Sequence, residues 1–453
     1  MLIAGVMATL SLMAADAPKY VFYYIGDGMG MQPLMTAQAY NRDILRNEKP
    51  LLMFRFPVAS WAMTYSASSP ITDSAAAGTA LSAGYKTGNG MLGVTPDTVP
   101  GMASVATQLK EMGYGVGIVT SVYADDATPG AWYAHVASRK MYYDIDVYAA
   151  KSGFDFIGGA GLKGLVDSDG NPTDIPVIMK ENGVQIVRGP EGISEINSDR
   201  VVLLSPEGMP DYNIGYTIDS IPGALTLPLI TEACLNHLEK QSPGRFFMMV
   251  EGGNIDHALH ANDAGAAITE MLNFNDALEI AYNFYLQHPD ETLILVSADH
   301  DTGGMSHVKD GLGVYRYVKV SKEEFSNYCK GILRSRMVYT WDDMKQYLTE
   351  NFGLFTHIKV SEEKEDDLRE KFDETFEKRN SADQETLYAS FNGFAVEVFD
   401  IINNAAGTIF TTTGHSGNPV PVFAVGVGSD MFKGVNNNTD LPRILREILE
   451  IND

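Results

Sequence analysis

Residues 246–260 read FFMMVEGGNIDHALH, in which an uninterrupted apolar run ends at a glutamate and is soon followed by two histidines. Residues 20–30 (YVFYYIGDGMG) and residues 292–300 (TLILVSADH) show the same pattern, in which an apolar run is followed by an aspartate. Runs that are apolar at every position are typical of strands buried on both faces, as in a parallel sheet. We therefore predict three buried strands that each end at a carboxylate.

Amphipathic patterns alternate with these strands. Two more strand-like runs occupy residues 116–120 and 422–425, and helical patterns occupy residues 104–112, 230–238 and 266–286. Alternating strands and helices predict an α/β three-layer sandwich with a central, mostly parallel sheet. In open sheets of this class, ligands bind beyond the carboxyl ends of the strands, where the carboxylates stand.

The segment from residue 305 to residue 405 differs from the rest of the chain. It is rich in charged residues, and Leu368, Phe372 and Phe376 repeat every four residues along one helical face. Ser321, with Glu324 three residues later, is a candidate for a reciprocal capping box, Thr340 is a candidate cap for a helix at residues 341–348, and Ser361 precedes a charged helical run. We predict a mostly helical insertion, resembling a crown or lid, in a core formed by residues 16–304 and 406–453.

Composition excludes several classes of protein. The 453 residues are 45% hydrophobic and 20% charged, which excludes collagen and disordered chains. Acidic residues outnumber basic ones 58 to 33, so the net charge of -25 argues against nucleic-acid partners. With only Cys234 and Cys329, the chain is no disulfide scaffold and has no cysteine-based zinc site. One disulfide or two free buried thiols both remain open.

The first residues resemble a signal peptide. Residues 2–15 (LIAGVMATLSLMAA) are uncharged and mostly apolar, with the length of a signal-peptide core but too short to span a bilayer. We predict a signal peptide over residues 1–15 and export to the periplasm or the medium; the alternative is a buried first strand or helix. No later stretch approaches about 18 consecutive apolar residues, so no transmembrane helix is expected.

Candidate metal ligands stand at the ends of the predicted strands. Taken singly, an aspartate after a strand is more typical of a turn or a helix cap, and a lone histidine is more typical of an ordinary core or surface residue. Asp256 and His260, however, are four residues apart, which places both side chains on one helical face. Imidazoles and carboxylates are zinc ligands, and hard carboxylate oxygens suit magnesium. The sequence therefore predicts a divalent-metal site at Asp27, Glu251, Asp256, His260, Asp299, His300 and His415.

A candidate nucleophile lies in residues 72–80 (TDSAAAGTA). Ser74 stands just ahead of an alanine-rich helix, where the helix dipole and free backbone N–H groups favour an anion. The alternative interpretation is that Asp73 or Ser74 merely caps this helix.

Six segments, taken together and in order, resemble the alkaline phosphatase family. They are GDGMG (26–30), TDSAAAGTA (72–80), DDATPGAWYAHVASR (125–139), VEGGNIDHALH (250–260), SADHDTGG (297–304) and TTGHSGNPVPVFAVG (412–426). The resemblance covers residues 21–304 and 411 to the end, while the segment 305–405 matches no motif of the family.

This resemblance implies two zinc ions and one magnesium ion. One zinc would be held by Asp256, His260 and His415, and the other by Asp27, Asp299 and His300, with Ser74 as its movable ligand. Magnesium would be held by Asp27, Thr128 and Glu251, with Asp126 acting through water. Arg139 would clamp the substrate phosphate, which His257 would contact through water.

The implied activity is the hydrolysis of small-molecule phosphate monoesters through a phosphoserine at Ser74. Two zinc ions can clamp the attacking and leaving oxygens of such a displacement. Alternatives are a phosphodiesterase, sulfatase or phosphosugar mutase relative and a non-catalytic binding protein. Arg139 argues against a diesterase, because it would engage an oxygen that a diester has esterified; Ser74, rather than a cysteine, argues against a formylglycine sulfatase.

The insertion leaves the core just after His300 and returns just before His415. We therefore expect it to cover the mouth of the site; the alternative is a surface domain that does not contact the site. The assembly considered is a homodimer, in which a second subunit could share this cover.

Overall fold

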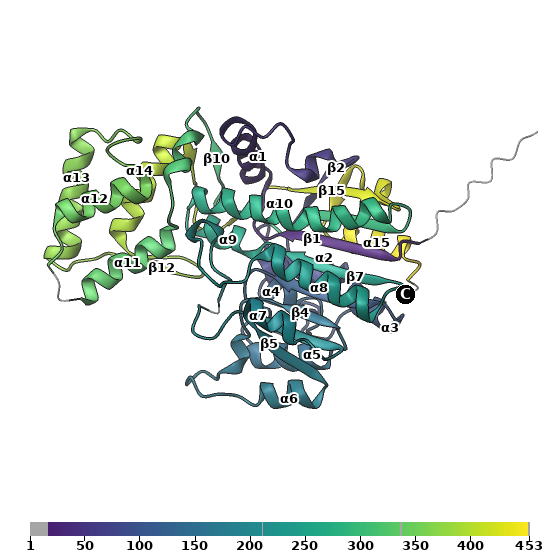
Figure 1. The fold of residues 1–453 in the computed structure, drawn as a ribbon. Helices are drawn as coiled ribbons and strands as arrows, with labels where there is room; N and C mark the ends of the chain where they lie inside the picture. Colours follow the sequence, from purple (N-terminus) through teal and green to yellow (C-terminus); the bar gives the residue numbers. More distant parts are fainter. Residues whose placement is uncertain (1–16, 211, 336–337, 452–453) are drawn as a thin grey trace, which may run out of the picture.

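The computed structural model describes residues 17–210, 212–335 and 338–451. The predicted signal peptide at residues 1–15 lies outside the described residues. A sheet with the strand order β16-β2-β15-β8-β1-β7-β3-β4-β6-β5 runs through the centre (Figure 1). Its strands are β1 (Tyr20–Gly26), β2 (Val58–Met63), β3 (Gly115–Thr120), β4 (Phe156–Gly158), β5 (Val184–Arg188), β6 (Arg200–Leu204), β7 (Phe246–Glu251), β8 (Thr292–Ala298), β15 (Val420–Gly426) and β16 (Val435–Asn437).

The apolar runs of the sequence form the middle of this sheet. β1, β3, β7 and β8 are buried at every position, which is why their sequences do not alternate. β1 pairs in parallel with both β7 and β8, so the three predicted strands are neighbours. β15 is also a strand, as predicted, but it runs antiparallel to β8 and β2.

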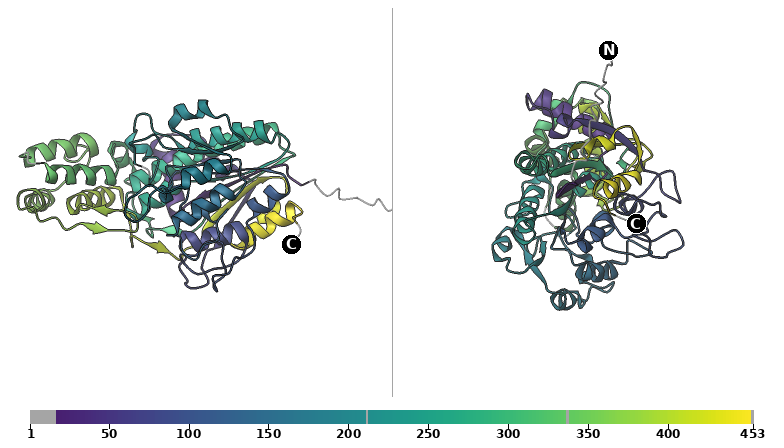
Figure 2. Two further views of the ribbon diagram at one scale, coloured as in Figure 1. Left: turned by 90° about the horizontal axis from the view of Figure 1, so that it is seen from below. Right: turned by 90° about the vertical axis from the view of Figure 1, so that its right-hand side faces the viewer.

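Helices cover both faces of the sheet, which confirms the three-layer architecture (Figure 2). α8 and α10 pack together on one face, and α2 packs with α4 and α15 on the other. The helices of this part are α1 (Met31–Ala39), α2 (Ser74–Ala83), α3 (Val105–Glu111), α4 (Ala127–Gly130), α5 (Tyr142–Lys151), α6 (Ile175–Glu181), α7 (Gly189–Gly192), α8 (Leu227–Gln241), α9 (Gly253–His260), α10 (Ala264–Gln287) and α15 (Asp440–Ile448).

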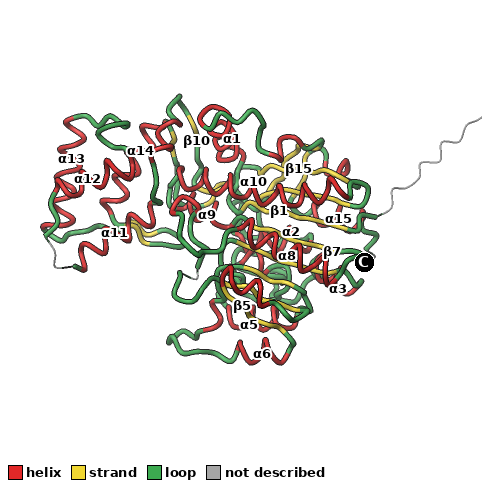
Figure 3. Tube along the Cα trace, in the orientation of Figure 1, coloured by secondary structure: helices red, strands yellow, loops and turns green. Residues whose placement is uncertain are grey.

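A second group of helices lies beyond one end of the sheet (Figures 1 and 3). It contains α11 (Lys322–Arg334), α12 (Trp341–Phe352), α13 (Glu362–Phe372), α14 (Gly393–Ala406) and the short hairpin β11 (Gln384–Glu385) and β12 (Ser390–Phe391). β10 (Ser306–His307) pairs with β13 (Thr408–Ile409) where the chain leaves and returns. Phe325, Phe352, Phe372 and Phe394 are buried among these helices.

The predicted helix caps are present, with one difference. Thr340 and Asp343 form a reciprocal capping box at the start of α12. Ser321 accepts from the N–H of Glu324, but its own N–H donates to Asp219 at 2.7 Å rather than to Glu324. The start of α11 is therefore tied to the core by a side chain that lies 102 residues earlier in the chain.

Cys234 and Cys329 are both buried free thiols. Among the described residues, we find no helix whose length and apolar character would allow it to cross a membrane.

Candidate active site

The register of the central strands brings the strand-end carboxylates together. β1 pairs with β8 in a register that places Ile25 opposite Ser297. Asp27 and Asp299, two residues further along each strand, therefore leave the sheet side by side. On the other side of β1, Ile25 lies opposite Glu251, the last residue of β7. All three carboxylates are buried. Groups that are far apart in the sequence thus meet at one edge of the sheet.

Gly28 allows the loop after β1 to pass close to α9. Its φ of 67° is unfavourable for residues with a side chain, and a Cβ here would lie 2.7 Å from Asp256 Oδ1. Its N–H donates to Asp299 Oδ1 at 3.0 Å. Gly28 is therefore required both by its backbone conformation and by the close approach of Asp256.

A first cluster forms between α9 and β14 (His415–Ser416). Nε2 of His260 lies 3.2 Å from Asp256 Oδ2 and 3.1 Å from Nε2 of His415. The opposite nitrogens donate to backbone carbonyls: Nδ1 of His260 to Thr413 at 2.5 Å, and Nδ1 of His415 to Thr72 at 2.9 Å. Because a carbonyl oxygen only accepts, Nδ1 of each ring carries a proton, and each imidazole in its neutral form presents an Nε2 lone pair to the cluster.

A two-stranded ladder places His415 against the strand end of β8. β14 pairs with β9 (Asp301–Thr302), with His415 opposite Thr302. The rings of His415 and His300 stack with their centroids 3.6 Å apart. The segment that follows the insertion is thereby brought to the carboxyl edge of the sheet.

A second cluster surrounds Nε2 of His300. The Ser74 hydroxyl lies 3.1 Å from this nitrogen, Asp299 Oδ2 lies 3.1 Å from it, and Asp27 Oδ1 lies 3.6 Å from it. Nδ1 of His300 donates to Thr302 Oγ1 at 3.1 Å, while the Thr302 hydroxyl donates to Asp256 Oδ1 at 2.5 Å. Thr302 thus orients one side chain from each cluster.

These donor atoms fit divalent cations. Asp256, His300 and His415 form one group, and Asp27, Asp299 and His300 a second, in which one ligand atom from each residue lies within 4.8 Å of the others. Lone pairs of nitrogen and carboxylate oxygen that face each other at about 3 Å repel unless a cation or a proton lies between them. Among the described residues, neither Asp27 Oδ1 nor either carboxylate oxygen of Glu251 has a hydrogen-bond partner.

The electrostatics of the cluster agree with this fit. Burial, with the charge of Asp256, raises the pKa of Asp299 to about 7, and burial raises the pKa of Glu251 to about 8. Burial and the neighbouring Asp299 also raise the pKa of Asp27 well above its ordinary value. Burial lowers the pKa of His300 well below 6.5, which leaves its imidazole neutral and able to act as a ligand. A bound cation would offset the repulsion between the carboxylates.

The predicted magnesium ligands are neighbours of Asp27. Thr128, in α4, donates to Asp27 Oδ2 at 3.4 Å, and Glu251 interacts electrostatically with Asp27. Asp126 accepts from Nη2 of Arg139 at 2.8 Å and from the N–H of Ala127 at 2.7 Å. Asp126 therefore links the predicted metal ligands to the predicted phosphate clamp.

Ser74 is the first residue of α2, and Asp73 is its N-cap. Asp73 Oδ1 accepts from the N–H of Ala76 at 3.0 Å, while Oδ2 lies 3.6 Å from Nη1 of Arg139. Capping thus falls to Asp73 and leaves the Ser74 hydroxyl directed at His300. The hydroxyl stands at the positive end of the helix dipole, beside a guanidinium.

Comparison with known proteins identifies the family. The sequence profile described as "Alkaline phosphatase" matches residues 18–163 and 179–451. The chain belongs to the alkaline phosphatase family. Alkaline phosphatase 4 of Bacillus subtilis is 29% identical over 448 residues, covering 95% of this chain and 89% of that protein. Alkaline phosphatase 3 of the same organism is 30% identical, and the match covers 96% of this chain and 90% of that protein.

Solved structures agree with this assignment. The cold-active alkaline phosphatase of the psychrophile Shewanella sp. is 27% identical, with a TM-score of 0.78 over 95% of this chain and 99% of that chain. The Thermus thermophilus alkaline phosphatase is 23% identical and shares the fold. Its TM-score is 0.80, over 99% of this chain and 96% of that chain. This alkaline phosphatase is therefore an enzyme that hydrolyses phosphate monoesters.

Three residues around the site were not predicted from the sequence: Asp73, Thr302 and Tyr388. Thr302 lies two residues after His300 and could have been found as the partner of its second ring nitrogen. Asp73 was predicted only as a helix cap. Tyr388 comes from the insertion, and its ring packs against that of His257 with the centroids 4.1 Å apart. No local pattern connects Tyr388 to the site.

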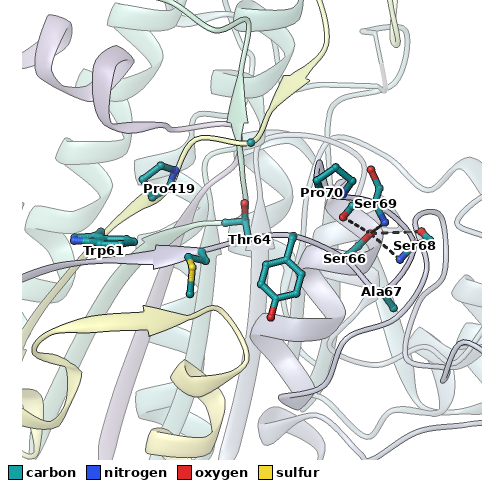
Figure 4. A pocket seen from close by; sticks show the side chains of 11 residues that line it. Trp61, Thr64, Ser66, Ala67, Ser68, Ser69, Pro70 and Pro419 are labelled. Atoms are coloured by element: carbon teal, nitrogen blue, oxygen red, sulfur yellow. Dashed lines mark hydrogen bonds between the residues drawn. The ribbon is translucent and has the colours of Figure 1, made fainter.

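An apolar hollow opens beside the loop that carries His415 (Figure 4). Trp61, Met63 and Tyr65 line it, and each is more than one-third exposed. Pro419, four residues after His415, also lines it and lies near Trp61. This surface is distinct from the polar cluster of the site.

Proposed function

We propose that this alkaline phosphatase uses two zinc ions and one magnesium ion, and that it transfers the phosphoryl group to Ser74 before water releases it. The proposed first zinc ligands are Asp256, His260 and His415, the second Asp27, Asp299 and His300, and the magnesium ligands Asp27, Thr128 and Glu251, with Asp126 acting through water. The observation that carries this proposal is the 3.1 Å contact between the Ser74 hydroxyl and His300 Nε2, inside a cluster of carboxylates.

In the proposed reaction, Ser74 Oγ attacks phosphorus, so that an O–P bond forms while the bond to the leaving alcohol breaks in line. Bound metal ions would neutralise the phosphoryl charge and lower the pKa of the Ser74 hydroxyl. The N-terminus of α2 adds backbone N–H groups beside the phosphoryl group. Water then hydrolyses the phosphoserine, which restores the serine and yields inorganic phosphate.

Arg139 is the proposed phosphate clamp. Asp126 and Asp73 hold its guanidinium from two sides, which limits its orientations. A planar guanidinium can donate to two nonbridging oxygens at once. A diester has lost one of these oxygens to esterification, so the clamp favours monoesters. His257, whose pKa burial lowers to about 4, would be a neutral partner for a water on the phosphate.

We also propose that residues 16–304 and 406–453 form the core, that residues 305–405 cover the site mouth, and that the enzyme is exported and dimeric. The support for the cover is that Tyr388, from the insertion, contacts His257.

The support for the dimer is the exposed apolar surface at Trp61, Met63 and Tyr65 (Figure 4). Sedimentation of the wild type and of Trp61→Glu tests the dimer: we expect a dimer for the former and a monomer for the latter.

The central experiment compares an aryl phosphate monoester with the matching diester, with metal analysis of the same sample. We expect kcat/KM for the monoester to exceed that for the diester by at least about 100-fold, or roughly 2.7 kcal/mol of discrimination in the transition state. Arg139→Ala should lower kcat/KM for the monoester by about 10- to 100-fold and affect the diester less. A preference for the diester, or equal losses on both substrates, would contradict the proposal.

A further inference from the structure

The insertion extends an aromatic side chain into the site. The Tyr388 ring packs on His257 with the ring centroids 4.1 Å apart and the planes tilted by 36°, and it packs edge-on against His260, with the centroids 5.2 Å apart at an angle of 76°. Both histidines lie on α9, next to the proposed zinc ligand Asp256. Tyr388 lies more than 120 residues after His260, the nearest of these residues in the sequence, so only the fold brings them together.

Tyr388 sits at the tip of a tight hairpin. β11 and β12 pair with Glu385 opposite Ser390. Between them, the N–H of Thr386 donates to the carbonyl of Ala389 at 2.9 Å, and the N–H of Ala389 donates to Thr386 Oγ1 at 3.2 Å. These hydrogen bonds close the turn that carries Tyr388.

The hairpin is in turn fixed to α11 (Figure 1). The N–H of Asn392 donates to Ser326 Oγ at 2.8 Å, and Lys330 Nζ donates to the carbonyl of Ser390. Lys322 Nζ lies over the Phe391 ring, 5.2 Å from its centroid, and it also donates to the carbonyl of Ala261, the residue after His260, at 2.8 Å. The position of Tyr388 is thus set by contacts that reach back to the end of α9.

The electrostatic neighbours of Tyr388 are those of a phosphate site. The Arg139 guanidinium interacts with Tyr388, Asp126 and Asp73. Among the described residues, Tyr388 has ring contacts with His257 and His260, and none of these residues forms a hydrogen bond with its hydroxyl. This phenol therefore has a donor to offer beside the guanidinium that we assign to the phosphoryl group.

We propose that Tyr388 is a substrate-binding residue whose hydroxyl donates a hydrogen bond to a phosphoryl oxygen held by Arg139. The insertion then takes part in phosphate recognition within its own subunit, rather than only limiting access to the site. This inference rests on the proposed roles of Ser74, Arg139 and the metal ligands. Its ligand class is a phosphate monoester dianion or inorganic phosphate.

The test compares Tyr388→Phe, which keeps the stacked ring, with Tyr388→Ala and with a control. The control is Tyr339→Phe, which removes a hydroxyl that lies 2.7 Å from the Tyr328 hydroxyl within the insertion. Calorimetric titration of the metal-loaded proteins with inorganic phosphate measures binding without turnover. We expect Tyr388→Phe to weaken phosphate binding by about ten-fold, as befits a hydrogen bond to a charged group, with zinc content and melting temperature unchanged. Tyr339→Phe should bind phosphate like the wild type.

The outcomes separate this inference from the proposed function. If the wild type binds phosphate and hydrolyses monoesters while Tyr388→Phe binds phosphate within two-fold of it, the role of the hydroxyl is wrong. If Tyr388→Ala loses phosphate binding while Tyr388→Phe keeps it, the ring contributes through packing and not through its hydroxyl. That result would overturn the inference as well. A wild type that neither binds phosphate nor hydrolyses monoesters would contradict the proposed function itself.

Discussion

At the scale of single residues, Asp73 caps α2, while the hydroxyl of Ser74, the proposed nucleophile, lies 3.1 Å from Nε2 of His300. We expect Ser74→Ala to lower kcat by about a thousand-fold or more, because the attacking oxygen is removed. Acid quenching with labelled substrate should trap phosphoserine in the wild type and none in the variant. Ser82→Ala, on the same helix but bonded to the carbonyl of Ala131, is the matched control and should keep normal turnover. Wild-type turnover in Ser74→Ala would remove Ser74 from the mechanism.

Thr302 contributes at the same scale by orienting ligands. Its hydroxyl accepts from His300 Nδ1 and donates to Asp256, so Thr302→Val should loosen one side chain in each cluster while keeping the shape of the residue. Partners of this kind typically change metal affinity by about 10- to 100-fold. Competition with a zinc chelator measures this directly. Unchanged zinc affinity in Thr302→Val would show that the neighbouring packing alone orients the ligands.

At the scale of elements, α11 joins the insertion to the core through a buried lysine. Burial lowers the pKa of Lys322 to about 8, from an ordinary 10.5. The unfolded chain therefore binds more protons between pH 8 and about 10.5, so the contribution of Lys322 to stability rises with pH across this window and is lost as pH falls through 8. Asp263 and Asp400 face the ammonium group, and Ala261 accepts its hydrogen bond.

Lys322→Met removes this titration while keeping most of the buried volume. We expect the melting temperature of the wild type, relative to the variant, to increase between pH 8 and pH 10. Thermal unfolding of both proteins over this range is the measurement, and Lys359→Met, whose exposed chain lies in the same insertion, is the control. Parallel curves for the wild type and Lys322→Met would contradict the lowered pKa.

The insertion itself gives a prediction for a whole element. The stem β10–β13 closes the loop, so the segment between its strands can be replaced by a short linker without cutting a core strand. We expect zinc binding to stay near the wild-type level and KM to change more for bulky phosphoesters than for small ones. If the shortened protein is folded and both substrate sizes respond alike, the insertion plays no part in access to the site.

At the scale of the whole molecule, metal binding should contribute to stability. The proposed ligands lie at the carboxyl ends of β1, β7 and β8 and in α9 and β14, so a bound cation would hold together segments that span most of the chain. An ion that binds only the folded state stabilises it by roughly 4 kcal/mol at 1,000 times its dissociation constant. Chelation should therefore lower the melting temperature by several degrees, and added zinc should restore it. A melting temperature that chelation does not change would argue against occupied sites.

The sequence alone determined the features that depend on neighbouring residues. Unbroken apolar runs predicted β1, β7 and β8, because a strand buried on both faces has no polar side. The spacing of Asp256 and His260 placed both on one face of α9, and the residues that begin α11 and α12 were recognised as caps. These patterns are local, since periodicity and capping act over a few residues.

Only the tertiary structure decided which distant segments meet. β15 reads like its parallel neighbours, but its direction depends on the path of the chain around β2 and β8. The N–H of Ser321 donates to the side chain of Asp219 rather than to that of Glu324. Tyr388 contacts His257 from a hairpin that is fixed to α11. Pairing and side-chain contacts of this kind are stabilised by burial in three dimensions, which leaves no periodic trace in the sequence.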